Sequence, residues 1–156
     1  MGLYYEDVHV GQVFESPGRT ITETDVVNFA AYTGDWNQLH TNEVYARETM
    51  FGRRVVHGLL GLAVAVGFVS RMGLFEGTTL AMLGIKDWTF KAPVFIGDTV
   101  RVRITITHKR VTSRGDRGIL DRRFELINQD GVVCQEGNIG IMVKLRNPVE
   151  EAADRQ

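Results

Sequence analysis

The sequence predicts one α+β domain, in which a long buried helix packs against a curled antiparallel sheet. Two parts of the apolar pattern carry this prediction: helical spacing dominates before Gly73, and alternation with β-branched residues dominates after it. A chain of 156 residues can build a single core without disulfides or a metal. No repeat or linker divides it, so we expect one domain over residues 1–156, with its core at about 8–145 and a short polar C-terminal tail.

Two helices are predicted before the long one. Thr22 and Asp25 form an imperfect capping box, and the apolar residues that follow suit one face of a helix ending at Gly34. A short amphipathic helix is expected over 42–49, with the side chains of 44–46 turned inward.

The segment 57–72 is apolar on almost every side, which indicates a helix that is buried all round. It is shorter than the roughly 18 to 20 apolar residues that a membrane span needs, and its glycines suit close packing. We expect Gly73 to end this helix in the left-handed conformation.

Strands are predicted after Gly73 because β-branched and polar residues alternate there. The segments are 79–90, 100–111, 117–128 and 132–145, and 13–21 can supply one more. Turn signals at 97–98, 113–116 and 129–131 separate them and predict short antiparallel hairpins. The basic stretch of the second hairpin, which includes Arg122 and Arg123, is expected to lie on a solvated outer face, although coenzyme A phosphates can use some of it.

Charge and cysteine content exclude several classes of protein. The chain has 18 Lys and Arg against 19 Asp and Glu, so it lacks the general attraction for nucleic acid or anionic membranes that a basic protein has. Cys134 is the single cysteine, the four histidines show no metal-site spacing, and the first residues do not form a secretory signal. We therefore expect a cytoplasmic protein with no nucleic-acid partner, no membrane partner, no metal and no cofactor.

Candidate catalytic residues cluster just before the apolar helix. Asp35, Asn37 and His40 lie in one short irregular segment, where backbone turns can bring an acid and a base together. Gly58 opens the apolar helix after His57, and a free amide there can stabilise a developing oxyanion. The alternatives are that these polar residues only close turns and cap helices, and that Gly58 only relieves crowding.

Three ordered motifs resemble the MaoC-like dehydratases and (R)-specific enoyl-CoA hydratases. They are Gly-Asp-Trp-Asn-Gln-Leu-His at 34–40, Phe-Gly-Arg-Arg-Val-Val-His-Gly-Leu-Leu at 51–60, and Phe-Lys-Ala-Pro-Val-Phe-Ile-Gly-Asp at 90–98. The resemblance runs from about residue 8 to residue 144. It implies the hot dog fold, in which an antiparallel sheet wraps a long central helix.

The resemblance also implies roles for individual residues. Asp35 and His40 match the catalytic pair, the amide of Gly58 matches the position that binds the thioester carbonyl, and Asn37 matches a residue that orders the loop. Lys91 lies within the third motif and is a candidate to bind a coenzyme A phosphate.

Two positions depart from the family pattern. Gln38 stands where the family usually has proline, which is expected to loosen the turn, and Val66 stands where some members have serine. The second difference puts serine-dependent positioning in doubt and suggests a different acyl preference.

The activity that the resemblance implies is reversible hydration of a trans-2-enoyl-CoA to the (R)-3-hydroxyacyl-CoA, a hydro-lyase reaction of fatty acid metabolism. Two alternatives stay open: an acyl-CoA thioesterase on the same fold, and a non-catalytic acyl-CoA-binding module. Exposed strand edges, together with the resemblance, predict a homodimer or a higher even-numbered oligomer with coenzyme A near the interface.

Overall fold

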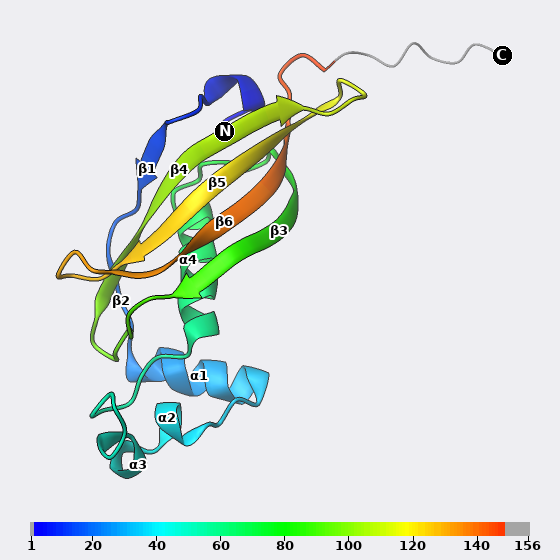
Figure 1. The fold of residues 1–156 in the computed structure, drawn as a ribbon. Helices are drawn as coiled ribbons and strands as arrows, with labels where there is room; N and C mark the ends of the chain where they lie inside the picture. Colours follow the sequence, from blue (N-terminus) through cyan, green and yellow to red (C-terminus); the bar gives the residue numbers. More distant parts are fainter. Residues whose placement is uncertain (1, 149–156) are drawn as a thin grey trace.

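The computed structural model describes residues 2–148 (Figure 1), so part of the predicted C-terminal tail, 149–156, lies outside the described residues. Five antiparallel strands form the main sheet in the order β1-β4-β5-β6-β3, and a short sixth strand, β2, pairs with β4. The strands are β1 (Val13–Glu15), β2 (Arg19–Thr20), β3 (Thr79–Phe90), β4 (Thr99–Val111), β5 (Arg117–Ile127) and β6 (Val133–Lys144).

Helix α4 packs against this sheet, and three shorter helices gather at the end of the molecule where α4 begins (Figure 1). The helices are α1 (Glu23–Thr33), α2 (Gln38–Thr41), α3 (Glu43–Arg47) and α4 (Gly58–Arg71), and a 3₁₀ turn covers Tyr5–Asp7. The predicted architecture of one long helix against an antiparallel sheet is therefore confirmed, while the expected curl of the sheet stays a prediction. No helix within residues 2–148 combines the length and the hydropathy that a membrane crossing requires.

The core lies between α4 and the inner face of the sheet. Alternate residues of β4 point inward and are fully buried, as a strand with one covered face requires. They pack with the buried side of α4 and with β5 and β6; the shared cluster includes Val64, Ala65, Phe68, Val102, Ile104, Phe124 and Ile139. This packing fixes the position of α4 and therefore of its first residue.

The capping signals of the sequence are confirmed. The Thr22 hydroxyl accepts a hydrogen bond from the Asp25 amide, and the Asp25 carboxylate accepts one from the Thr22 amide. Gly34 ends α1 at φ 77°, and Gly73 follows α4 at φ 64°, both in the left-handed region that glycine tolerates best.

Two helix predictions were wrong in detail. Helix α4 is not buried all round, because Leu59 is 61% exposed and Ala63 and Gly67 also face outward. In the second case the helix is shorter than 42–49, and Val44 is 73% exposed instead of turned inward. Both errors have one cause. Apolar composition indicates that a surface favours burial, but it does not show whether other residues of this chain bury it.

One predicted hairpin is absent from the described sheet. Strands β4 and β5, and β5 and β6, are antiparallel neighbours as expected, but β3 pairs with β6 instead of β4. The segment 91–98 crosses from β3 to β4 instead of folding back, and a bridge between Val55 and Phe95 holds it beside the start of α4. Gly97-Asp98 is therefore not the hairpin turn that was predicted. These residues end the crossing segment, directly before β4 begins at Thr99.

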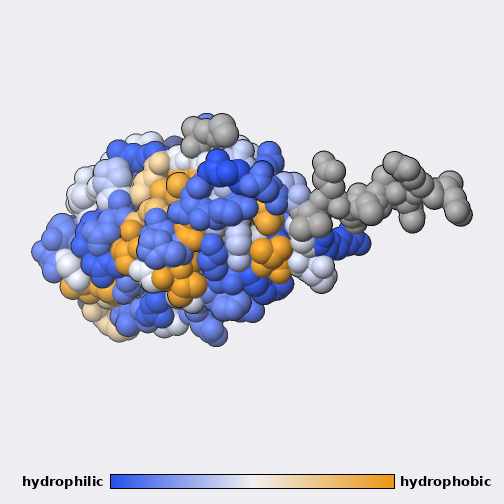
Figure 2. Space-filling model, turned by 90° about the horizontal axis from the view of Figure 1, so that it is seen from above, coloured by the Kyte–Doolittle hydropathy of each residue, from blue (hydrophilic) through white to orange (hydrophobic). Residues whose placement is uncertain are grey.

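Strand β3 is left as an edge strand whose two faces are largely exposed. It carries apolar side chains that a solvated edge does not ordinarily present: Leu80, Met82, Leu83, Ile85 and Phe90. Apolar surface interspersed with hydrophilic side chains is also visible when the molecule is seen from above (Figure 2).

Candidate active site

A cavity of about 600 Å³ lies at the N-terminal end of α4, and all three sequence motifs contribute to its wall. Asp35 and His40 come from the first motif, Gly58 from the second, and Phe90 and Lys91 from the third. Most of the remaining wall is apolar, which suits a small organic ligand with a few placed polar contacts. Segments far apart in the sequence therefore meet at one site.

The loop between α1 and α2 is shaped by short-range hydrogen bonds. The Asp35 amide donates to the Thr33 hydroxyl, and the Asn37 amide donates to the Asp35 carboxylate. Asn37 then caps α2, because its side-chain oxygen accepts from the Leu39 amide at 2.9 Å. Asn37 thus lies where it orders the loop, and its side chain does not line the cavity.

His40 is half-buried on α2 and is oriented by the backbone. Its Nδ1 lies 2.7 Å from the carbonyl oxygen of Val55, and a carbonyl can only accept, so Nδ1 carries the proton. In the neutral ring this leaves the other nitrogen, Nε2, as the one that can act as a base or bind a water. The acceptor that selects this tautomer, the Val55 carbonyl, belongs to the second motif.

His57 has a role that the sequence did not reveal. It is buried, and its Nε2 donates to the backbone carbonyl of Asp35 at 2.9 Å. Its ring stacks on His40 with 3.9 Å between ring centroids, and it also contacts Phe29. Burial is the main cause that lowers the pKa of His57, so the neutral ring is favoured. His57 therefore holds both members of the candidate pair while its own Nδ1 stays buried without a hydrogen-bond partner within the described chain.

Donor atoms of Asp35, His40 and His57 all lie within 4.8 Å of one another. One water can bridge two groups at such a separation, which suits an acid and base pair. The same three donors are the one set within residues 2–148 that could hold a metal ion. Each ring already uses one nitrogen on a backbone carbonyl, so a metal would depend on the two remaining nitrogens and the carboxylate.

The candidate oxyanion position, Gly58, is the first residue of α4 and lines the cavity. Gly58 follows the N-cap His57, so no intrahelical acceptor faces its amide. A Cβ at this position would lie 2.7 Å from the Phe90 ring, so only glycine leaves the backbone open beside that ring. The amide, reinforced by the dipole of the helix, can donate to a carbonyl oxygen in the cavity.

Gln135 also lines the cavity and was not identified from the sequence. Its side-chain oxygen accepts from the Trp88 indole at 3.1 Å, which turns its amide nitrogen toward Gly61. Glutamine within an alternating strand gives no signal of such a role, because only the fold shows that β6 passes the start of α4.

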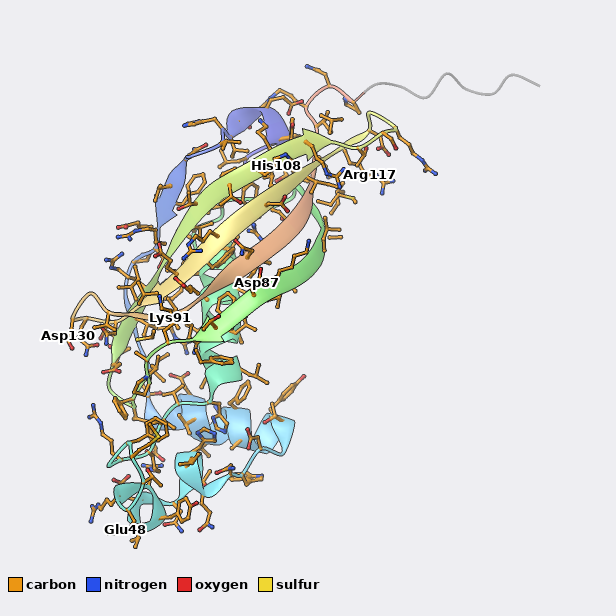
Figure 3. The ribbon with its side chains drawn as sticks, viewed as in Figure 1. Glu48, Asp87, Lys91, His108, Arg117 and Asp130 are labelled. Carbon is orange, nitrogen blue, oxygen red and sulfur yellow. The ribbon has the colours of Figure 1, made fainter. Side chains whose placement is uncertain are left out.

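The remaining predicted site residues are placed as follows. Lys91 lies on the cavity wall and is exposed, and its amine pairs with Glu136 at 3.2 Å (Figure 3). Gln38 does not leave the turn loose, because its side-chain oxygen accepts from Asn42 at 2.8 Å. Val66 does not line this cavity but a second one further along α4.

An arginine clamp fixes the site from outside. Arg54 donates to both carboxylate oxygens of Glu23 on α1, at 2.7 and 2.6 Å, and to Glu43 on α3 at 2.9 Å. These carboxylates raise the pKa of Arg54 above its usual range. The clamp joins α1, α3 and the segment that leads into α4, and these flank the loop and helix α2 that carry Asp35 and His40.

Comparisons with known proteins agree with this arrangement. The MaoC-like domain family model matches residues 7–121. An (R)-specific enoyl-CoA hydratase of Rhodospirillum rubrum is 41% identical over 108 residues, covering 67% of this chain and 69% of that protein. Protein MaoC of Klebsiella aerogenes is 38% identical over 108 residues, but the match spans 69% of this chain and only 32% of that protein.

A solved structure gives the same result for the fold. The (R)-hydratase PhaJ1 of Pseudomonas aeruginosa superposes with a TM-score of 0.77 at 27% identity, over 99% of this chain and 95% of that one. The long helix and antiparallel sheet are thus those of the hot dog fold. On the extent of the family match and the identity to these relatives, the chain belongs to the MaoC-like domain family of hydratases and dehydratases.

Proposed function

We propose that this protein hydrates trans-2-enoyl-CoA to (R)-3-hydroxyacyl-CoA, and dehydrates the product in the reverse direction, with Asp35 and His40 as the catalytic residues. One observation carries the proposal. The Asp35 carboxylate and a His40 ring nitrogen lie within 4.8 Å of each other, at a largely apolar cavity whose wall includes the first residue of α4. The named activity of the R. rubrum relative supports the same reaction.

The geometry supports a mechanism with one water. The thioester oxygen accepts a hydrogen bond from the Gly58 amide, which draws charge from the double bond and makes the β-carbon electrophilic. A water held between Asp35 and His40 attacks that carbon and gives one proton to the pair. The pair returns one proton to the α-carbon, so the elements of water are added and both residues end as they began.

The proposed substrate explains the composition of the cavity. Its apolar wall includes Leu39, Phe51 and Phe90, which suit an acyl chain. Lys91 is proposed to contact a coenzyme A phosphate, and it must then exchange its ion pair with Glu136 for that contact. An exposed ion pair is worth only about 0 to 1 kcal/mol, so this exchange costs little.

We also propose that the protein is a homodimer, paired along β3. This edge strand presents exposed apolar side chains on a long, unpaired edge, and a second copy related by a two-fold axis can pair with it antiparallel. Phe90 at the end of β3 and Lys91 next to it line the catalytic cavity, so a partner on this edge borders the cavity. Coenzyme A would then lie near the subunit interface.

The proposal is tested with a short-chain trans-2-enoyl-CoA. Loss of the enoyl absorbance without release of free thiol, and formation of the (R)-alcohol, is the expected result. Asp35→Asn and His40→Ala are each expected to lower kcat by about 100-fold or more. Matched controls are Asp130→Asn and His108→Ala, whose side chains lie away from α1–α3 (Figure 3) and are expected to leave kcat unchanged.

Each alternative gives a different outcome. Thiol release that keeps pace with substrate loss would make the protein a thioesterase. Tight binding of acyl-CoA without turnover, over a range of chain lengths and branched or dicarboxylic acyl groups, would make it a binding module. A wild-type rate in either Asp35→Asn or His40→Ala would overturn the catalytic assignment.

A further inference from the structure

Arg122 is a charged residue in the core. The sequence placed it on a solvated face, together with Arg123, but consecutive residues of a strand point to opposite faces. Arg122 is 3% exposed and faces α4, while Arg123 lies on the other face and pairs with Glu136. The earlier expectation was therefore wrong for Arg122.

This guanidinium has no acidic partner within residues 2–148. Its Nε donates to the carbonyl of Ile139 at 3.2 Å, and its remaining neighbours include the rings of Phe124 and Phe75, at 5.0 and 5.8 Å from the guanidinium carbon. Burial lowers the pKa of Arg122 to about 10, so the group remains charged at neutral pH. An unpaired charge in a protein core is unfavourable, and such groups ordinarily have a counter-ion.

Arg122 borders a second cavity of about 300 Å³. The cavity is lined by residues of the later turns of α4. These turns lie away from α1–α3, which gather where the helix begins (Figure 1). Its apolar wall includes Val66, Val69 and Ile141, and Ser70 and Thr79 are among its polar residues.

Glu76 is the acidic residue on the wall of this cavity, and it does not neutralise Arg122. Residue Glu76 is exposed, and the pKa of Arg122 is shifted by burial, with no contribution from Glu76. The cavity therefore combines an apolar body with one uncompensated positive charge.

We propose that this cavity binds a carboxylate carried on an apolar carbon chain, with the Arg122 guanidinium as the anchor. A guanidinium presents parallel N–H groups that match the two oxygens of a carboxylate, and a buried pair of this kind is strong because both charges are compensated. The apolar wall accommodates the chain. A neutral ligand of the same shape leaves the charge unpaired and binds more weakly.

The carboxylate has two possible sources. One is the distal end of the acyl chain of a dicarboxylic thioester substrate, and this source rests on the proposed function. The distance along α4 from Gly58 to Val66 is about 12 Å at roughly 1.5 Å per residue, which a chain of about ten carbons can span. The other source is a free monocarboxylate that binds independently of the reaction.

The first test measures binding without catalysis. Hexanoate is expected to raise the Tm of the wild-type protein, whereas hexanamide, which has nearly the same shape and no charge, is not. Arg122→Met should lose the response to hexanoate and keep a Tm without ligand that equals or exceeds the wild-type value, because an uncompensated charge has been removed. Arg123→Met, on the opposite face of β5, is the matched control and should keep the response.

The second test distinguishes the two sources. If the distal carboxylate of the substrate is bound, kcat/KM for trans-2-decenedioyl-CoA should exceed that for trans-2-decenoyl-CoA by about 10- to 100-fold, and Arg122→Met should remove this preference. A hexanoate response without any such preference assigns the site to a free carboxylate. If neither thioester is hydrated, the proposed function fails, but the hexanoate result still decides the site.

Two results would overturn the proposal. In the first, hexanoate does not stabilise the wild-type protein, whatever the Tm of Arg122→Met; a lower Tm in that variant would then mark a purely structural arginine. In the second, a chain ending at Pro148 binds hexanoate while the full chain does not, which would make the acidic segment 149–156 the occupant of the cavity.

Discussion

His57→Phe is the substitution that tests most directly how the site is held together. Phenylalanine keeps a ring between Phe29 and His40, but it removes the donor that now lies 2.9 Å from the Asp35 carbonyl oxygen. The change therefore separates the hydrogen bond from the packing. His108→Phe, at an exposed position on β4, is the matched control (Figure 3).

The magnitude follows from the lost bond. The Asp35 carbonyl belongs to an exposed residue, so water can replace the lost donor, and the free energy of unfolding should fall by about 0.5–1.5 kcal/mol, the net value of one hydrogen bond. The Asp35 segment is then held less firmly, and a displacement of about 1 Å at a catalytic group can lower the rate by about 100-fold. We expect kcat to fall far more than KM changes. His57 positions the pair, whereas many other residues also line the cavity and contribute to substrate binding.

The pH dependence of stability gives a second measurement. The pKa of His57 lies below its ordinary value of 6.5 in the folded protein, so between the two values the unfolded chain binds more protons than the native one. The contribution of neutral His57 to stability is therefore complete above about pH 6.5 and declines as the pH falls below it. Denaturant titrations from pH 7 to pH 5 should show this decline in the wild type and a smaller one in His57→Phe. Wild-type kcat together with wild-type stability in the variant would refute the positioning role.

Three further predictions concern the cavity, the edge strand and metal ions. Gly58→Ala must displace the Phe90 ring and should lower kcat/KM by at least about tenfold, whereas Gly67→Ala on the same helix meets open space and should keep full activity while stabilising the helix by about 1 kcal/mol. Leu83→Lys on β3 should yield monomers by light scattering, whereas Val132→Lys in an exposed turn should not; a dimer that persists would rule out pairing along β3. Dialysis against a chelator should leave the hydration rate unchanged, and a loss that zinc restores would make the Asp35 cluster a metal site.

The helices and strands could be predicted from local sequence, because caps, glycines and alternation act over a few residues. The box at Thr22 and Asp25 and the glycines at 34 and 73 each fix a helix end by a local contact. The pairing of β3 with β6 could not be predicted in this way, since it joins segments far apart in the chain. The turn signal at 97–98 predicted a hairpin that the described sheet does not contain, because a local signal does not state which strand pairs with which.

The site was only partly predictable for a related reason. Asp35 and His40 are close in sequence and carry side chains suited to acid and base chemistry, so their motif was informative. His57 also stood in a motif, but its side chain acts through the backbone carbonyl of Asp35, and no pattern of side chains reveals such a bond. Gln135 is polar in a strand that alternates, and only the path of β6 brings it to the cavity.

Arg122 is the clearest case in which sequence and structure had to be combined. Two adjacent arginines in a strand point to opposite faces, and the alternation with Leu120, Phe124 and Leu126 assigns the inner face to Arg122, which composition alone does not show. In the structure the inward position borders a cavity whose wall includes Val66. The chemistry of hydration needs only the start of α4, whereas the later turns of the same helix border Arg122. Under the two proposals, a change at Val66 or Arg122 alters the acyl preference while Asp35 and His40 stay in place. The comparison of trans-2-decenedioyl-CoA with trans-2-decenoyl-CoA measures this separation of acyl preference from catalysis.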